Sequence, residues 1–189
     1  RLCQLIRYPT ISARMGEREV DEAFHGLIEF LQSAYPATAT AAGVTASAPY
    51  HLVFDIPGTR PELEPILMIA HFDVVDVSES ARWSHPPFAG EVSDGYVWGR
   101  GAIDDKSVLC AELEAVEAVL AAGTTLERGV VVALGGDEEL SGHMGAARIA
   151  ESFGKRRFHL VLDEEAVIAK GMLAQPHLPI ALIGIAEKG

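Results

Sequence analysis

Four clusters of acidic or imidazole side chains stand out in the sequence, three of them just after strongly apolar runs and one at the start of a helix-like segment. In chain order they are His71-Phe72-Asp73, Asp104-Asp105, Asp137-Glu138-Glu139 and Asp163-Glu164-Glu165. Ligands of an open α/β sheet bind beyond the carboxyl ends of its strands, so these clusters are expected to converge. Divalent cations would stabilise that much negative charge in one place. The pattern therefore predicts a cation site.

Each cluster also has an ordinary interpretation when it is taken alone. Asp104 could cap a helix, because an acidic side chain is favourable at a helix N-terminus. Glu138 and Glu139 could belong to a solvated turn, and Asp163 could belong to a strand-end loop. These explanations would have to hold independently at four places, so the shared site is the favoured hypothesis.

The types of ligand indicate the class of metal. Imidazole combined with carboxylates suits zinc, with manganese or cobalt as substitutes, and the two cysteines, Cys3 and Cys110, are too few for a thiolate site. A carboxylate shared by two ions would give a two-metal site that activates water. Adjacent side chains such as Glu138 and Glu139 do not easily face one ion. One of them is expected to bind metal and the other to transfer a proton.

Apolar periodicity predicts the elements that position these clusters. We expect helices over 1–35, 105–122 and 143–153, strands over 51–56, 66–70, 130–134, 158–162 and 180–185, a hairpin over 91–98, and loops over 36–49 and 82–90. Continuous apolar runs indicate strands that are buried on both faces. Strands that alternate with helices predict an α/β fold with a mostly parallel sheet and helices on both of its faces.

Composition excludes several classes of protein. The 189 residues are 49% hydrophobic and 22% charged, which argues against intrinsic disorder. The net charge of −12 argues against nucleic acid and anionic membranes as partners. No apolar run reaches the roughly 18 residues that span a bilayer, and no signal peptide is recognisable, so a cytoplasmic location is expected. The chain starts at Arg1 without methionine, so we expect a piece of a longer protein.

Three motifs together resemble one family of zinc metallopeptidases. They are HFDVV at 71–75, WGRGAIDDK at 98–106 and GGDEE at 135–139. The family includes aminoacylase, acetylornithine deacetylase, succinyl-diaminopimelate desuccinylase, carnosinase and glutamate carboxypeptidase. The finer resemblance is to the branch of carboxypeptidase S and the N-acyl amino acid hydrolases. It implies that residues 1–179 are the N-terminal part of a phosphorylase/hydrolase-like catalytic domain, and that 180–189 enter a lid and dimerisation domain.

The resemblance also implies roles for individual residues. His71, Asp104, Glu139 and Glu164 are the expected ligands of two zinc ions, with Asp104 bridging them and Asp163 as the alternative to Glu164. Asp73 is expected to orient the imidazole, and Glu138 is the expected general base. A cis peptide bond is expected after Asp104. The family's last ligand is a histidine near the C-terminus that His177 does not match, so the chain alone is expected to be inactive.

The function implied by the resemblance is hydrolysis of an amide or peptide bond next to a free carboxylate by metal-activated water. The substrate would be a small peptide or an N-acyl amino acid, and the full-length protein would be a homodimer through the lid. A related di-zinc aminopeptidase and a non-catalytic binding domain are the alternatives, and Glu138 argues against the second. Trp83, Phe88 and Trp98 are interpreted as local packing residues, and His85 and His143 as surface histidines.

Overall fold

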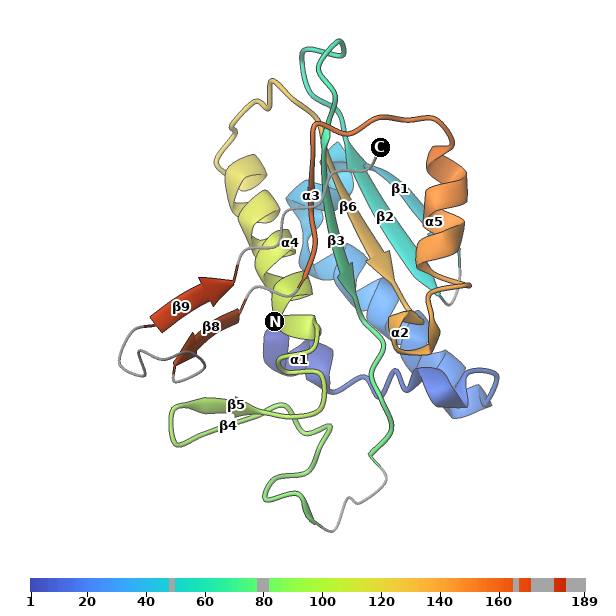
Figure 1. Cartoon of the computed structure of the whole chain (residues 1–189), viewed down its shortest axis with the longest axis vertical. Helices are drawn as coiled ribbons and strands as arrows, with labels where there is room; N and C mark the ends of the chain where they lie inside the picture. Colours follow the sequence, from blue (N-terminus) through green and yellow to red (C-terminus); the bar gives the residue numbers. More distant parts are fainter. Residues whose placement is uncertain (48–49, 78–81, 165–166, 171–178, 183–189) are drawn as a thin grey trace.

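The centre of the molecule is a five-stranded sheet in the order β1-β2-β6-β3-β7 (Figure 1). The computed structural model describes residues 1–47, 50–77, 82–164, 167–170 and 179–182. The strands are β1 (Gly43–Ser47), β2 (His51–Ile56), β3 (Ile66–His71), β6 (Val130–Gly135) and β7 (Leu160–Leu162). β3 pairs in parallel with β6 and β7, whereas β2 is antiparallel to β1 and β6. Within this sheet β2 alone therefore runs against the other strands.

The register of the sheet brings the predicted clusters to one edge. His71 at the end of β3 lies opposite Gly135 at the end of β6, so the segments that follow these two strands leave the sheet side by side. On the other side of β3, Leu162 lies opposite Met68, and the chain continues from there toward the same edge. The carboxyl ends of parallel strands thus assemble side chains that are far apart in sequence.

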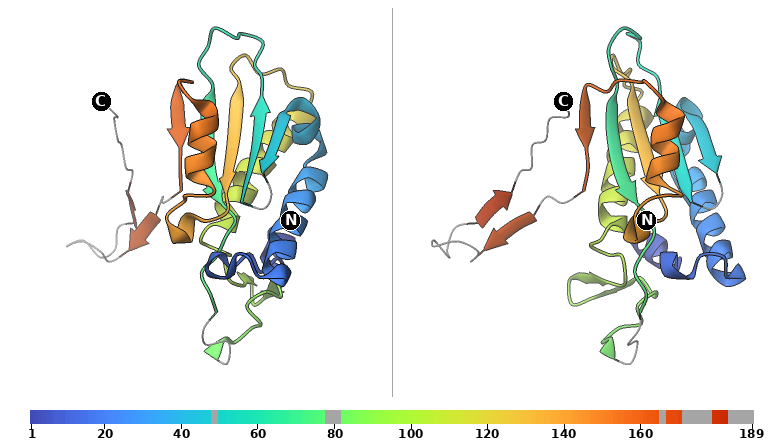
Figure 2. Two further views of the ribbon diagram at one scale, coloured as in Figure 1. Left: turned by 90° about the vertical axis from the view of Figure 1, so that its right-hand side faces the viewer. Right: turned by 45° about the vertical axis from the view of Figure 1, so that its right-hand side comes forward.

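Helices cover both faces of the sheet (Figure 2). One face carries α1 (Leu2–Ile6), α2 (Arg18–Ala34), α3 (Pro36–Ala41) and α4 (Lys106–Ala121), and the other carries α5 (Ala146–Phe153). Alternate residues of a strand point to opposite faces, so Phe54 packs in the α2–α4 core and Val53 in the cluster with Ile149 of α5. The prediction of an α/β fold with a mostly parallel sheet and helices on both faces is confirmed. Among the described helices none is long and apolar enough to cross a bilayer.

Several local predictions are confirmed and others are wrong. The hairpin of β4 (Glu91–Ser93) and β5 (Tyr96–Trp98) forms as predicted and turns at Asp94 and Gly95, which both have positive φ. The predicted loop 36–49 instead contains α3 and β1, because Pro36 starts a short helix and β1 adds to the exposed edge of β2. Instead of one helix over 1–35, α1 and α2 are separated by the 3-10 helix η1 (Ser12–Arg14).

The strand predicted over 158–162 is exposed rather than buried. The three residues of β7 keep 46%, 50% and 42% of their surface exposed, because β7 is the edge of the sheet and α5 packs over β2 and β6. Near the C-terminus, β8 (Val167–Lys170) and β9 (Pro179–Leu182) pair in a separate antiparallel sheet. The rest of the strand predicted over 180–185, and residues 183–189 of the predicted lid entry, lie outside the described residues.

The N-terminal segment braces the loop that follows β3. Thr10 is fully buried, and its hydroxyl donates a hydrogen bond of 2.5 Å to the carbonyl of Phe72. Val74 returns a backbone hydrogen bond of 2.9 Å to Thr10. The buried ammonium of Lys106, at the start of α4, donates to the carbonyls of Leu5 and Tyr8 at 3.1 and 2.7 Å. The β3 loop and the start of α4 are thus tied to the same short stretch of chain.

Replacing Thr10 by valine is expected to lower the free energy of unfolding by about 1–2 kcal/mol, because the carbonyl of Phe72 would lose a buried donor while the shape stays nearly the same. Denaturant unfolding monitored by circular dichroism measures this change. Thr40→Val is the control, because Thr40 is exposed on α3 and should shift stability by less than about 0.5 kcal/mol. Equal stability of Thr10→Val and the wild type would contradict the bracing role.

Candidate metal centre

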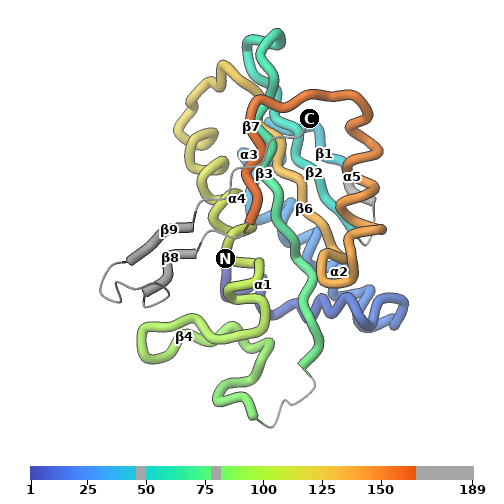
Figure 3. Tube along the Cα trace, viewed as in Figure 1, coloured from blue at the N-terminus to red at the C-terminus, as the bar shows by residue number. Residues whose placement is uncertain are grey.

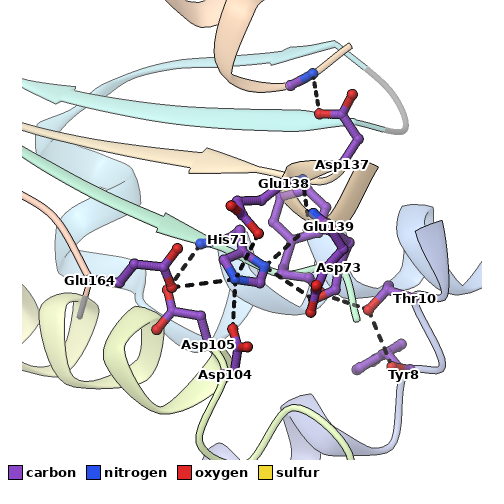
Figure 4. Close-up of polar contacts among 12 residues, drawn as sticks. Tyr8, Thr10, His71, Asp73, Asp104, Asp105, Asp137, Glu138, Glu139 and Glu164 are labelled. Atoms are coloured by element: carbon purple, nitrogen blue, oxygen red, sulfur yellow. Dashed lines mark hydrogen bonds and ion pairs between the residues drawn. The ribbon is translucent and has the colours of Figure 1, made fainter. Parts of the chain in front are cut away.

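The side chain of His71 lies at the centre of the acidic clusters (Figure 4). Its Nε2 atom is 2.9 Å from Oδ1 of Asp104, 3.3 Å from Oε2 of Glu164 and 3.8 Å from Oε2 of Glu138. The imidazole is almost fully buried, whereas the side chain of Asp104 is 68% exposed. The predicted residues therefore converge at the carboxyl edge of the sheet, with one side open.

Two groups of potential ligand atoms share this histidine. In one group, atoms of His71, Asp104 and Glu139 all lie within 4.8 Å of one another, and in the other, atoms of His71, Asp105 and Glu164 do so. Of the two acids considered at the end of β7, Glu164 lies in such a group. Asp163 instead accepts a hydrogen bond from the backbone of Glu164. The peptide bond between Asp104 and Asp105 is cis, as the resemblance predicts.

Asp73 connects the imidazole to the two glutamates that follow β6. Its Oδ1 atom is 3.2 Å from Nδ1 of His71 and accepts a hydrogen bond of 3.1 Å from the backbone N–H of Glu138. Its Oδ2 atom accepts a hydrogen bond of 3.1 Å from the backbone N–H of Glu139. Asp73 is fully buried. One carboxylate therefore fixes both the histidine ring and the 3-10 helix η3 (Glu138–Leu140).

Two further aspartates support the site and were given no role by the sequence analysis. Asp105 accepts a hydrogen bond of 3.1 Å from the backbone N–H of His71 and shares a hydrogen bond with Glu164. Asp137 is buried and accepts hydrogen bonds from the backbone of Met144 and Gly145, which fixes the loop between η3 and α5. Both residues belong to the acidic clusters of the sequence. Their spacing alone does not distinguish a supporting carboxylate from a ligand.

The electrostatics of the cluster favour the uptake of positive charge. Burial lowers the pKa of His71, but the hydrogen bond and charge of Asp73 and the charges of Glu164 and Asp105 outweigh it and raise that pKa to about 10. Burial, reinforced by the charges of Asp105 and Glu138, raises the pKa of Glu164 to about 7. Burial also raises the pKa of Asp105 to about 6, against the opposing effect of its hydrogen bond from the backbone of His71. Burial also raises the pKa of Glu139. The metal-free cluster thus holds protons that a metal ion would displace.

Glu112 lies on the face of α4 toward this cluster, and the negative charges of the cluster act on it as well. Its Oε2 atom is buried and has no hydrogen-bond partner among the described residues. Burial raises the pKa of Glu112 to about 8, with additional contributions from the charges of Asp105 and Asp163. Since the folded protein binds this proton more tightly than the unfolded chain, the resulting stability is complete below about pH 4.5 and is lost as the pH rises toward 8.

Replacing Glu112 by glutamine is therefore expected to stabilise the metal-free protein by about 1–3 kcal/mol at pH 8 and to change it little at pH 4.5. Chelator-treated protein unfolded in urea at both pH values provides the measurement. Glu22→Gln, on the exposed side of α2, is the matched control and should have a small effect at either pH. A Glu112→Gln protein with the pH dependence of the wild type would show that Glu112 is ionised in the folded state.

The other histidines singled out in the sequence do not join the cluster. His85 pairs with Glu91 in the loop region before β4, with 3.0 Å between Nδ1 and a carboxylate oxygen. His143 is exposed and belongs to neither group of potential ligands. His177 lies outside the described residues.

A mostly parallel α/β sheet with histidine and carboxylates gathered at its carboxyl edge is an arrangement typical of metallopeptidase catalytic domains. The chain belongs to the peptidase family M20/M25/M40, whose family model matches residues 67–183. The resemblance inferred from the motifs is confirmed. Membership of this metallopeptidase family implies a divalent metal ion, typically zinc.

Similar proteins include carboxypeptidases and N-acyl amino acid hydrolases. The chain is 35% identical over 195 residues to probable carboxypeptidase S-like 2 of Dictyostelium discoideum, covering 100% of this chain and 38% of that protein. It is 35% identical over 188 residues to N-fatty-acyl-amino acid synthase/hydrolase PM20D1 of Xenopus tropicalis, covering 97% of this chain and 36% of that protein. The chain thus spans less than two-fifths of the length of these relatives.

Solved structures of M20 enzymes share the fold. A metallo-carboxypeptidase of Sulfolobus solfataricus, Sso-CP2, superimposes with a TM-score of 0.71 at 24% identity, covering 88% of this chain and 37% of that chain. Human carnosine dipeptidase 1 superimposes with a TM-score of 0.70 at 21% identity, covering 89% of this chain and 38% of that chain. At these identities the likeness concerns the fold alone.

Proposed function

We propose that this chain carries the metal centre of a zinc-dependent hydrolase that cleaves an amide or peptide bond next to a free carboxylate. The observation that carries the proposal is the arrangement around His71. Two groups of potential ligand atoms share its imidazole, and the carboxylate of Glu138 lies beside them, 3.8 Å from Nε2. Relatives named as carboxypeptidases and as N-fatty-acyl-amino acid hydrolases support the substrate class.

The donor set fits two zinc ions. One imidazole surrounded by carboxylates, without thiolates, is a ligand set that zinc accepts, and zinc–ligand distances near 2 Å are compatible with donor atoms that lie within 4.8 Å of one another. The family resemblance supports His71, Asp104, Glu139 and Glu164 as the residues that would hold the ions, with Asp104 shared. In the geometry, Glu164 groups with His71 and Asp105, and Glu139 groups with His71 and Asp104. Zinc bound there would lower the pKa of a water molecule and polarise the carbonyl of the amide.

We assign to Glu138 the transfer of a proton from the attacking water to the leaving amine. The backbone of Glu138 is held by Asp73, while its side chain is 53% exposed and lies beside the imidazole of His71. The carboxylate accepts a proton from the attacking water and then delivers it to the nitrogen of the leaving amine as the C–N bond breaks. Asp73 keeps the imidazole of His71 and the main chain of Glu138 and Glu139 in place during this transfer.

The proposal extends to the organisation of the whole protein. Residues 1–179 are assigned to the first part of the catalytic domain and 180–189 to the entry into a lid and dimerisation domain. The lid would supply groups that bind the substrate carboxylate, and the full-length protein would form a homodimer through it. The substrate is a small peptide or an N-acyl amino acid.

Metal analysis combined with a paired substrate panel tests the proposal. Purified full-length protein is expected to contain about two zinc ions per chain and to hydrolyse N-acetyl amino acids or dipeptides. It should leave the matching C-terminal amides, which lack the free carboxylate, nearly untouched. Cleavage that requires a free amino group instead would indicate an aminopeptidase. Absence of stoichiometric metal and of any hydrolysis would indicate a binding domain.

A further inference from the structure

A hollow of about 440 Å³ opens onto the proposed metal centre from the side of the β4–β5 hairpin. Asp104 and Glu139 form part of its lining, so the hollow is continuous with the proposed ligands. Most other side chains in its wall are apolar or aromatic, and the wall also contains the charged side chain of Arg100. The apolar and aromatic members are Val75, Trp83, Tyr96, Val97, Trp98 and Ile103.

Several of these side chains are unusually exposed for their type. Ile103, directly before Asp104, is 87% exposed, and Tyr96 is 67% exposed. Large apolar side chains that gather at the surface around a hollow mark a site of interaction rather than a failure of packing. Here they gather beside Asp104 and Glu139, two of the proposed ligands, which line the same hollow.

The aromatic wall is held in place by the protein itself. The indole N–H of Trp98 donates a hydrogen bond of 3.1 Å to the carbonyl of Ser93, and its ring stacks on His85 with 4.3 Å between centroids. The guanidinium of Arg100 lies 5.2 Å from the ring of Trp83. Rings that are already fixed lose little conformational freedom when a ligand binds, which favours recognition.

The two ends of the hairpin that carries Tyr96 and Trp98 lie beside α1 (Figure 3). A Cβ atom on Gly99 would overlap Cγ2 of Ile6, and one on Gly90 would overlap the carbonyl oxygen of Cys3. Arg7 adds a hydrogen bond of 3.1 Å to the carbonyl of Ala89. The wall of the hollow is therefore fixed to the same N-terminal segment that braces the β3 loop.

We propose that this hollow binds an apolar substituent, aliphatic or aromatic, on the acyl side of the scissile amide. The inference rests on the proposed function, since it places the scissile amide beside Asp104 and Glu139 and leaves the carboxylate side of the substrate to the lid. It revises the interpretation of Trp83 and Trp98 as packing residues, because both rings border the hollow. Each methylene that enters such an apolar surface is expected to strengthen binding roughly two- to fourfold.

A series of N-acylglycines tests the inference on the zinc-loaded full-length protein. Affinity by calorimetry and KM by steady-state kinetics are measured for the acetyl, butyryl, hexanoyl and octanoyl members. In parallel, 19F NMR of protein labelled with 5-fluorotryptophan reports on Trp83 and Trp98, with each resonance assigned from a tryptophan-to-phenylalanine variant. Affinity should rise with chain length, and both resonances should shift with the octanoyl ligand and much less with the acetyl ligand.

Matched variants locate the effect. Tyr96→Ser and Ile103→Ser remove exposed side chains of the wall, and each should lower the octanoyl-to-acetyl affinity ratio about fivefold or more. Val92→Ser is the control, because Val92 is 66% exposed in the same hairpin but does not line the hollow, and the ratio should be unchanged. Circular dichroism confirms that all three variants are folded.

The possible results separate the two proposals. Chain-length-dependent binding that weakens in the wall variants, without hydrolysis of any member, would support the hollow and refute the proposed function. Hydrolysis without chain-length dependence would support the function and overturn the hollow. Chain-length dependence that survives in Tyr96→Ser and Ile103→Ser, with unmoved tryptophan resonances, would place the apolar group elsewhere and also overturn this inference.

Discussion

Replacing Glu138 by glutamine is expected to reduce kcat by about 10²–10⁴-fold or more while the zinc content stays unchanged. The amide has nearly the same shape as the carboxylate but cannot accept the proton of the attacking water. The backbone N–H of residue 138 would still donate to Asp73, so η3 and the neighbouring Glu139 should keep their positions. Steady-state kinetics on full-length protein, with metal content measured on the same sample, tests both halves of the expectation.

Glu151→Gln is the matched control for this substitution. Glu151 is exposed on α5 and, among the described residues, pairs with Arg148 on the same helix, so its replacement should leave kcat and zinc content near those of the wild type. A zinc-loaded Glu138→Gln protein with a turnover similar to that of the wild type would refute the assignment of the general base. Loss of zinc from the variant would instead show that Glu138 is a ligand.

The convergence of the site was predictable from the sequence because it follows from strand order. Apolar runs that end in His71 and in the acids after Gly135 indicate parallel strands, and parallel strands bring their carboxyl ends together. The pairing of His71 with Gly135 bears this out. A prediction of this kind needs no side-chain geometry, only the positions where the strands end.

The supporting contacts were not predictable in the same way. The link from Asp73 to the main chain of Glu138 and Glu139 joins positions 65 and 66 residues apart, and no local pattern in the sequence encodes it. The exposure of β7 depends on which strands α5 covers, and the helix at 36–41 depends on Thr38, whose backbone and hydroxyl donate to Glu117 of α4. These features are set by tertiary contacts that override local propensity.

The contacts of Asp73 predict a large effect for a substitution that changes only one atom. Replacing Asp73 by asparagine is expected to weaken zinc binding about 10–100-fold and to lower kcat with it. In the wild type, its two oxygens contact Nδ1 of His71 and accept hydrogen bonds from the backbone N–H groups of Glu138 and Glu139. Asparagine has one oxygen, so in either orientation its NH₂ group would face a donor. A buried donor opposite another donor is costly, and η3 with its glutamates should shift to relieve it.

Competition between the protein and a chromogenic chelator measures the zinc affinity of the Asp73→Asn variant. Asp94→Asn is the matched control, because Asp94 lies in the β4–β5 turn with a φ of 53°, a conformation that asparagine adopts readily. It makes the same chemical change far from the imidazole and should leave zinc affinity and kcat unchanged. An Asp73→Asn protein that binds zinc as tightly as the wild type would show that Glu139 and His71 keep their positions without this carboxylate. The positioning role of Asp73 would then have to be abandoned, because the hydrogen bonds that define it would carry no energetic consequence at the metal centre.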